Sequence, residues 1–141
     1  MPNGAMLPAG TASSRKKGND WRNDCRRAAI DAMGDIDPWN GCIRILCEFQ
    51  LPYPRSIPKY KFGWWPNTKQ PDIDKLQRAL FDALTGIVWA DDSQVSFVTA
   101  NKVYAWNDRP GCVVVVDFMS DEALVNIGHA HRDVVNVIDS L

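Results

Sequence analysis

The segment between Pro71 and Gly86 constrains the fold of this chain more than any other. Its apolar residues recur every three or four positions, at Ile73, Leu76, Leu80, Leu84 and Ile87. This spacing places side chains on one face of a helix, and Pro71 and Gly86 are typical of a helix start and stop. A helix with one apolar face needs a second layer to cover that face, so the segment predicts a layered domain.

Three other segments have strand patterns. Residues 42–50 alternate apolar and polar side chains, which predicts a half-buried strand. Residues 94–106 and 112–118 predict two more strands, joined by a hairpin turn at 107–111. The run Val113–Val116 has no polar face, so we expect the last strand to be central in the sheet.

Two further helices complete the predicted order of elements. Asp20 can cap the first, whose apolar side chains recur at Trp21, Cys25, Ala28, Ala29 and Ala32 before Gly34 closes it. Ser120 can cap the last, whose apolar stripe is Leu124, Ile127, Val134, Val135 and Ile138. The order is helix, strand, helix, two strands, helix. We therefore predict an α+β fold, a small mixed β-sheet packed by helices, in one domain at residues 20–141.

Residues 1–19 are rich in Gly, Pro, Ser, Lys and Arg and have no periodicity. They predict a basic, extended or mobile arm carrying Arg15, Lys16 and Lys17. No apolar run approaches the roughly 20 residues that a membrane span requires. Four scattered cysteines are too few for a disulfide framework, so we expect a reduced, cytoplasmic setting.

The net charge of −1 hides an asymmetry between the two halves. Residues 1–61 hold more Lys and Arg than Asp and Glu, and residues 62–141 hold the reverse excess. A basic half beside an acidic half suits a protein that grips a polyanion with one surface and a cation with another. A chance fluctuation on a solvated surface explains the charge equally well at this point.

Residues 51–71 predict a long loop that contains five prolines. Aromatic and basic side chains alternate along it, at Tyr53, Arg55, Lys59, Tyr60, Lys61, Phe62, Trp64, Trp65 and Lys69. Such a loop can stack on bases and pair with phosphates. Alternatively, the rings fill the edge of the core.

Four carboxylates flank the predicted central helix: Asp72 and Asp74 before it, Asp91 and Asp92 after it. In extended backbone, residues two apart point to the same side, so Asp72 and Asp74 converge if Asp72 precedes the helix. We expect a strand running back along the helix to return Asp91 and Asp92 to the same place. Four such carboxylates suit Mg²⁺, which prefers oxygen ligands and activates phosphate esters. The alternative is that Asp72 caps the helix, Asp74 matches its dipole, and Asp91 and Asp92 form a turn.

Basic residues near these carboxylates have two interpretations. Arg78 lies one turn after Asp74, where it either pairs with Asp74 or stabilises charge on a phosphate. Lys75 can act similarly, and Lys102 on the next strand is placed to contact a phosphate backbone. No glycine-rich phosphate loop occurs, so we expect no nucleotide cofactor. Cys42 and Cys47 point to opposite faces of a strand, and His129 and His131 diverge on a helix, so neither pair predicts zinc.

Several elements in one order resemble a known family. They are Pro71-Asp72-Ile73-Asp74-x-Leu76, Phe81-Asp82-Ala83-Leu84-Thr85, Asp91-Asp92-Ser93-Gln94-Val95 and Lys102. Residues 69–102 are similar to the RusA-type Holliday junction resolvases, which phages and prophages often encode. The resemblance implies a crossover junction endodeoxyribonuclease that acts in DNA recombination and repair. It also implies Mg²⁺, with Mn²⁺ as an alternative ion, and a homodimer that cuts four-way DNA by paired nicks in the bacterial cytoplasm.

The family's three essential aspartates align with Asp72, Asp74 and Asp92, and Asp91 aligns with the acidic residue before the third. The resemblance therefore implies a metal site of these four residues, and Lys69, Lys102 and the N-terminal arm are expected to hold DNA. Two residues depart from the pattern, because Lys75 replaces an Asn and Arg78 replaces a catalytic Lys. Arg keeps the charge but does not donate a proton at neutral pH.

The N-terminus also departs, since Met1 to Gly10 is a poor strand where family members begin with one. These departures motivate two alternative functions. One is a non-catalytic junction-binding protein of the same fold, and the other is a metal-dependent nuclease for other branched DNA.

Overall fold

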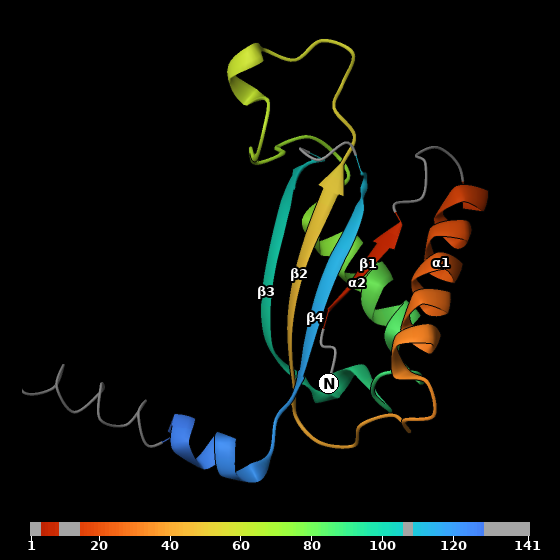
Figure 1. Cartoon of the computed structure of the whole chain (residues 1–141), viewed down its shortest axis with the longest axis vertical. Coiled ribbons are helices and arrows are strands. Elements are labelled where there is room, and N and C mark those ends of the chain that lie inside the picture. The colour runs from red at the N-terminus through yellow and green to blue at the C-terminus, as the bar shows by residue number, and fades with distance from the viewer. Residues whose placement is uncertain (1–3, 9–14, 106–108, 129–141) are drawn as a thin grey trace, which may run out of the picture.

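A computed structural model describes residues 4–8, 15–105 and 109–128 of the chain. It contains a four-stranded mixed sheet with the strand order β1-β4-β2-β3 (Figure 1). The strands are β1 (Gly4–Pro8), β2 (Ile43–Leu51), β3 (Val95–Tyr104) and β4 (Gly111–Phe118). Two long helices, α1 (Arg15–Met33) and α2 (Ile73–Leu84), pack on one face of the sheet. Two short 3₁₀ helices, η1 (Lys59–Lys61) and η2 (Asp92–Gln94), lie in the connections. The architecture is the predicted α+β single domain.

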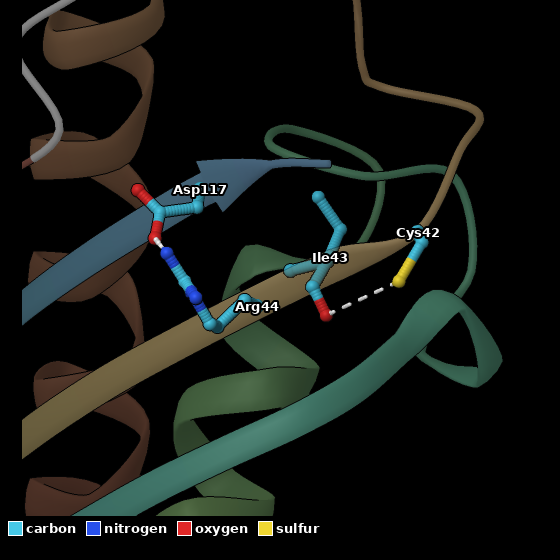
Figure 2. Close-up of polar contacts among 4 residues, drawn as sticks. All are labelled: Cys42, Ile43, Arg44 and Asp117. Atoms are coloured by element: carbon cyan, nitrogen blue, oxygen red, sulfur yellow. Dashed lines mark hydrogen bonds and ion pairs between the residues drawn. The ribbon is translucent and has the colours of Figure 1, made fainter. Parts of the chain in front are cut away.

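The inward face of β2 builds the core. Ile43, Ile45, Cys47 and Phe49 are almost completely buried against both long helices, as the alternation in the sequence predicts. From the helices, Cys25, Ala29, Leu80 and Leu84 complete this cluster. On the opposite face of the sheet, Arg44 pairs with Asp117 of β4 at 2.7 Å (Figure 2). Because these residues are also register partners, their ion pair favours the observed alignment of β2 and β4.

The expected hairpin between the last two strands is wrong. β2 lies between β3 and β4, pairing parallel with β3 and antiparallel with β4. Parallel strands need a long crossover connection, and here residues 52–94, with α2, provide it. Residue 106, the predicted strand end, and residues 107–108 of the predicted turn lie outside the described residues. The central position expected for Val113–Val116 is confirmed, because β4 pairs with both β1 and β2.

The N-terminal segment has more regular structure than its composition predicts. Residues 4–8 form β1 and pair antiparallel with β4 from Gly111 to Val115. α1 begins at Arg15 rather than after Asp20, because Arg and Lys are good helix formers and one Gly costs only about 1 kcal/mol. The expectation of an irregular arm is therefore wrong for these two segments.

The predicted ends of the other helices are confirmed where the structure describes them. Gly34, at φ +55°, closes α1 and donates from its backbone to the Ile30 carbonyl at 3.0 Å. Ser120 Oγ accepts from the Ala123 N–H at 3.2 Å and caps a helix at residues 121–128, which extends away from the sheet (Figure 1). Val134, Val135, Ile138 and both histidines lie outside the described residues. None of the described helices is long and apolar enough to cross a membrane.

The four cysteines are free thiols, and three of them are buried in the core. Burial raises the pKa of Cys25 to about 12 and that of Cys47 to about 11, and it raises the pKa of Cys112 as well. Cys42 is only half-buried and its Sγ contacts the carbonyl of Ile43 at 4.0 Å (Figure 2).

We expect Cys42 to react first with an aromatic disulfide reagent at pH 8, because the other thiols are inaccessible and resist ionisation. The measurement is the number of thiols modified over time in native buffer, with the denatured protein as the reference for all four. Rapid modification of three or four thiols in the native protein would contradict the buried core.

Candidate functional site

Asp72 occupies the N-cap position of α2, but its side chain does not act as a cap. Its backbone is extended, at φ −68° and ψ 145°, and its carboxylate makes no capping hydrogen bond. The carboxylate pairs instead with Lys75 at 3.6 Å, and both side chains are largely exposed. Exposed pairs of this kind contribute about 0–1 kcal/mol, so Asp72 is readily available to a stronger ligand. The interpretation of Asp72 as a side-chain helix cap is therefore wrong.

Asp72 and Asp74 line one groove at the start of α2, with a volume of about 490 Å³. Ile73 of α2 also lines it. The rest of the lining comes from the long loop and from the end of β3: Trp64, Pro66, Asn67, Ala100, Asn101, Lys102 and Val103. The two carboxylates thus face a space shared by three separate segments of the chain. This volume is within the usual range for ligand sites.

Lys102 fixes the position of this carboxylate pair. Its Nζ donates to the backbone carbonyl of Pro71 at 2.8 Å and also to that of Lys69. Both acceptors immediately precede α2, so the bonds hold the helix start against β3. An ammonium group has three donors, which leaves one for a phosphate oxygen. Lys102 therefore serves as a structural anchor and supplies positive charge to the groove.

Asp91 and Asp92 lie at the other end of α2, and the expectation that they return to its start is wrong. They follow the helix C-terminus, and α2 has 12 residues, which corresponds to roughly 18 Å. β3 begins only after them and runs back along the helix (Figure 1). The residue that this strand brings to the start of α2 is therefore Lys102, which bonds to the Pro71 carbonyl, and not Asp92. Within the described part of the chain, no group of three or more His, Cys, Asp or Glu could hold a metal ion.

Asp91 has a structural role in the segment that connects α2 to β3. Its Oδ1 accepts from the Ser93 N–H at 2.8 Å, and the side chain of Gln94 accepts from the Asp91 N–H at 2.8 Å, which completes a capping box on η2. The hydrogen bond from the Ser93 backbone is the main cause that lowers the pKa of Asp91. Gln94 also donates to the carbonyls of Trp39 at 2.6 Å and Gly41 at 2.9 Å. These bonds fix the backbone on both sides of Asp92.

The predicted basic residues are not all near the groove. Arg78 is exposed, does not line the groove and makes no ion pair with any described residue. Of its two interpretations, the pairing with Asp74 is therefore wrong. Lys69 is exposed beside the groove, and its backbone N–H donates to Asn67 Oδ1 at 2.8 Å. Arg15, Lys16 and Lys17 occupy the first turn of α1.

The sequence did not single out three polar or aromatic residues of the groove. Asn67 is only 8% exposed, and its side chain shapes the turn that leads to Lys69. Asn101 precedes Lys102 on β3, and Trp64 was visible only as one of several rings in a long loop. No periodic pattern connects these positions, because the groove forms where the loop crosses the end of β3.

The carboxylate pair has the chemistry that a magnesium site requires. Mg²⁺ in proteins is usually held by one or two carboxylates together with water and substrate phosphates. Asp72 has no competing role as a cap, and Asp74 opens into the same groove. The residues present therefore fit a divalent cation, although a single chain supplies only two of the expected ligands.

A sequence model of the family described as endodeoxyribonuclease RusA matches residues 5–117. The chain belongs to the RusA family. Its members are metal-dependent endodeoxyribonucleases of the Holliday junction resolvase class, which act in DNA recombination. The match runs from β1 to β4 and includes both ends of α2, so it covers the residues of the groove and the Asp91–Asp92 turn. A comparison with curated proteins finds no match.

We expect Asp91→Ala to lower the melting temperature at pH 7, because it removes the acceptor of the capping box. Asp91→Asn keeps an acceptor and should remain closer to the wild type. The folded pKa of Asp91 is lowered, so its stabilisation is present above the usual Asp pKa of about 3.9 and is lost as pH falls through the folded value. Thermal unfolding followed by circular dichroism at pH 7 and pH 3 checks this. Equal melting temperatures for Asp91→Ala and the wild type at pH 7 would contradict the structural role.

Proposed function

We propose that this chain is a Mg²⁺-dependent endonuclease that resolves four-way DNA junctions by paired nicks in the bacterial cytoplasm. Branched DNA is the substrate class of its family. The proposal depends on one observation: the Asp72 carboxylate makes no capping hydrogen bond and lines a groove together with Asp74 and Lys102. Two solvent-accessible carboxylates beside the positively charged Lys102 side chain suit the cleavage of a phosphodiester.

Asp72 and Asp74 would hold the ion, which when bound polarises the scissile phosphate and activates water. Lys102 offers its remaining N–H donor to a phosphate oxygen and keeps the two carboxylates in place. Lys75 pairs with Asp72 while no metal ion is bound. When an ion binds Asp72, the flexible Lys75 side chain is released and can contact a phosphate. Arg78 and the basic residues of α1 and of the long loop supply charge for the rest of the DNA backbone.

We further propose that Asp92 reaches this site from a second copy of the chain. Asp72 and Asp92 lie at opposite ends of α2 and β3, so two copies that run antiparallel along this edge bring them together. β3 is an edge strand of the described sheet, and its residues Phe97 and Val98 are 37% and 41% exposed. Ile73, at the start of α2, is 37% exposed. Antiparallel pairing centred on Phe97 would direct Lys102 toward η2 of the partner subunit, the 3₁₀ helix that begins at Asp92. A two-fold dimer of this kind has two equivalent sites, as paired nicks on a two-fold junction require.

We expect Asp74→Asn to abolish cleavage of a synthetic four-way junction while binding survives, because the change removes a metal ligand and keeps the shape of the side chain. Nicking on a denaturing gel and binding by gel shift, each with Mg²⁺ or Mn²⁺, measure the two effects. Linear duplex at the same salt is the control, since non-specific affinity depends steeply on salt. Full activity of Asp74→Asn would contradict the assignment of Asp74 as a metal ligand. Junction binding without nicking by the wild type in either ion would favour a non-catalytic junction-binding protein instead.

Shared sites make a specific prediction for mixed dimers. Asp74→Asn and Asp92→Asn are each expected to be inactive alone, since every site loses one ligand. A dimer with one chain of each kind has one site with both changes and one wild-type site. After joint unfolding and refolding of equal amounts, about a quarter of all sites should be intact and should give single-strand nicks.

If the three aspartates instead belonged to one chain, every site in the mixture would carry one change. The mixture would then remain inactive although size-exclusion chromatography showed a dimer. Mixing Asp74→Asn with Asp72→Asn is the matched control, because both changes fall on the same side of the shared site and no intact site can form.

A further inference from the structure

The long loop after β2 projects beyond the end of the sheet (Figure 1). Several of its aromatic rings are exposed to solvent. Tyr60, Phe62 and Trp64 are 69%, 56% and 55% exposed. Isolated exposed rings are common on proteins, so exposure alone does not indicate a site. What distinguishes Trp64 is how it is held and where it lies.

The loop is clamped to the sheet by Tyr53. Its hydroxyl donates to the carbonyl of Gly63 at 2.9 Å and accepts from the Gly63 N–H at 3.0 Å. Its ring stacks on buried Tyr104, with centroids 5.2 Å apart and an interplanar angle of 19°. Gly63 has φ +91°, a conformation that residues with a side chain rarely adopt. The residue that follows this anchored glycine is Trp64.

The edge of the Trp64 indole is fixed by two polar residues of β2. Its Nε1 donates to Glu48 Oε1 at 2.9 Å, and Glu48 Oε2 accepts from Gln50 Nε2 at 3.0 Å. Gln50 is only 2% exposed, so the chain of hydrogen bonds ends in the protein interior. The one hydrogen-bond donor of the indole is therefore satisfied, while more than half of the residue's surface stays open.

Trp64 also belongs to the groove that holds the carboxylate pair. It lines this groove together with Asp72, Asp74, Asn101 and Lys102. A flat apolar surface thus lies in the same cavity as the groups proposed to bind the scissile phosphate. Asn101 adds an exposed amide, which can donate to and accept from the edge of a base.

We propose that Trp64 is a stacking platform for one nucleobase next to the cleaved phosphate. This inference rests on the proposed nuclease function and assigns a substrate-binding role that goes beyond the carboxylates. Every base has a π-face, so a fixed ring accepts any of the four. A base in linear duplex must first leave its stack, whereas the branch point of a junction already interrupts stacking. The groove therefore favours branched DNA over linear duplex, with Glu48 as a positioning residue for the ring.

The test measures DNA binding in Ca²⁺ with the full-length protein, on a four-way junction and on linear duplex of the same sequence. Trp64→Ala should weaken junction binding about ten- to a hundred-fold and leave duplex binding unchanged, because only the stacked base is lost. Trp64→Phe keeps a ring and should retain most of the preference. Tyr60→Ala is the matched control, since Tyr60 is a more exposed ring of the same loop that does not line the groove.

A second readout locates the base directly. A junction with 5-iodouracil beside the branch point should photocrosslink to the peptide that contains Trp64. An unchanged junction preference in Trp64→Ala, or a crosslink elsewhere in the protein, would overturn the stacking role alone. A wild-type protein that binds junction and duplex equally would overturn the proposed function itself, so the two failures are distinguishable.

Discussion

The hydrogen bonds from Lys102 to the carbonyls of residues 69 and 71 hold the candidate site together. They join the end of β3 to the start of α2, two elements that otherwise meet only along their lengths. Core contacts fix α2 on the sheet, and the Lys102 bonds additionally fix the segment just before its first turn, which carries the carboxylate pair. The same strand end pairs with the loop, because the Asn67 N–H donates to the Lys102 carbonyl at 2.9 Å. One residue thus sets the relative positions of the helix, the strand and the loop that form the groove.

The fold was largely predictable because its core follows simple periodic patterns. The alternation in β2, the apolar stripe of α2 and the Val113–Val116 run each predicted the element that the structure contains. Strand order was not predictable in the same way. A turn-like sequence at residues 107–111 indicated a hairpin, but β2 lies between β3 and β4. Side-chain alternation shows which face of a strand is buried, whereas the backbone groups that pair along its edges are the same in every sequence. β1 was missed because its place in the sheet depends on pairing with β4, which local sequence does not encode.

The candidate site was predictable in composition but not in arrangement. Residue types and their spacing indicated a carboxylate pair at Asp72 and Asp74, and the structure places both in one groove. Asp92 lies at the far end of the helix because it follows the C-terminus of α2 and precedes β3, so the returning strand brings Lys102, and not Asp92, to the groove. Asn67 and Asn101 gave no signal, because their relation to the carboxylates arises only when distant segments meet.

The separation of Asp72 from Asp92 along α2 has a consequence for the cell. A nuclease that is complete as a single chain can damage DNA from the moment it folds. In the proposed dimer, each site combines Asp72 and Asp74 of one chain with Asp92 of the partner subunit, so a single chain holds no complete site. In that dimer, cleavage requires two chains to associate, so it depends on the concentration of the protein and a single chain does not cut DNA.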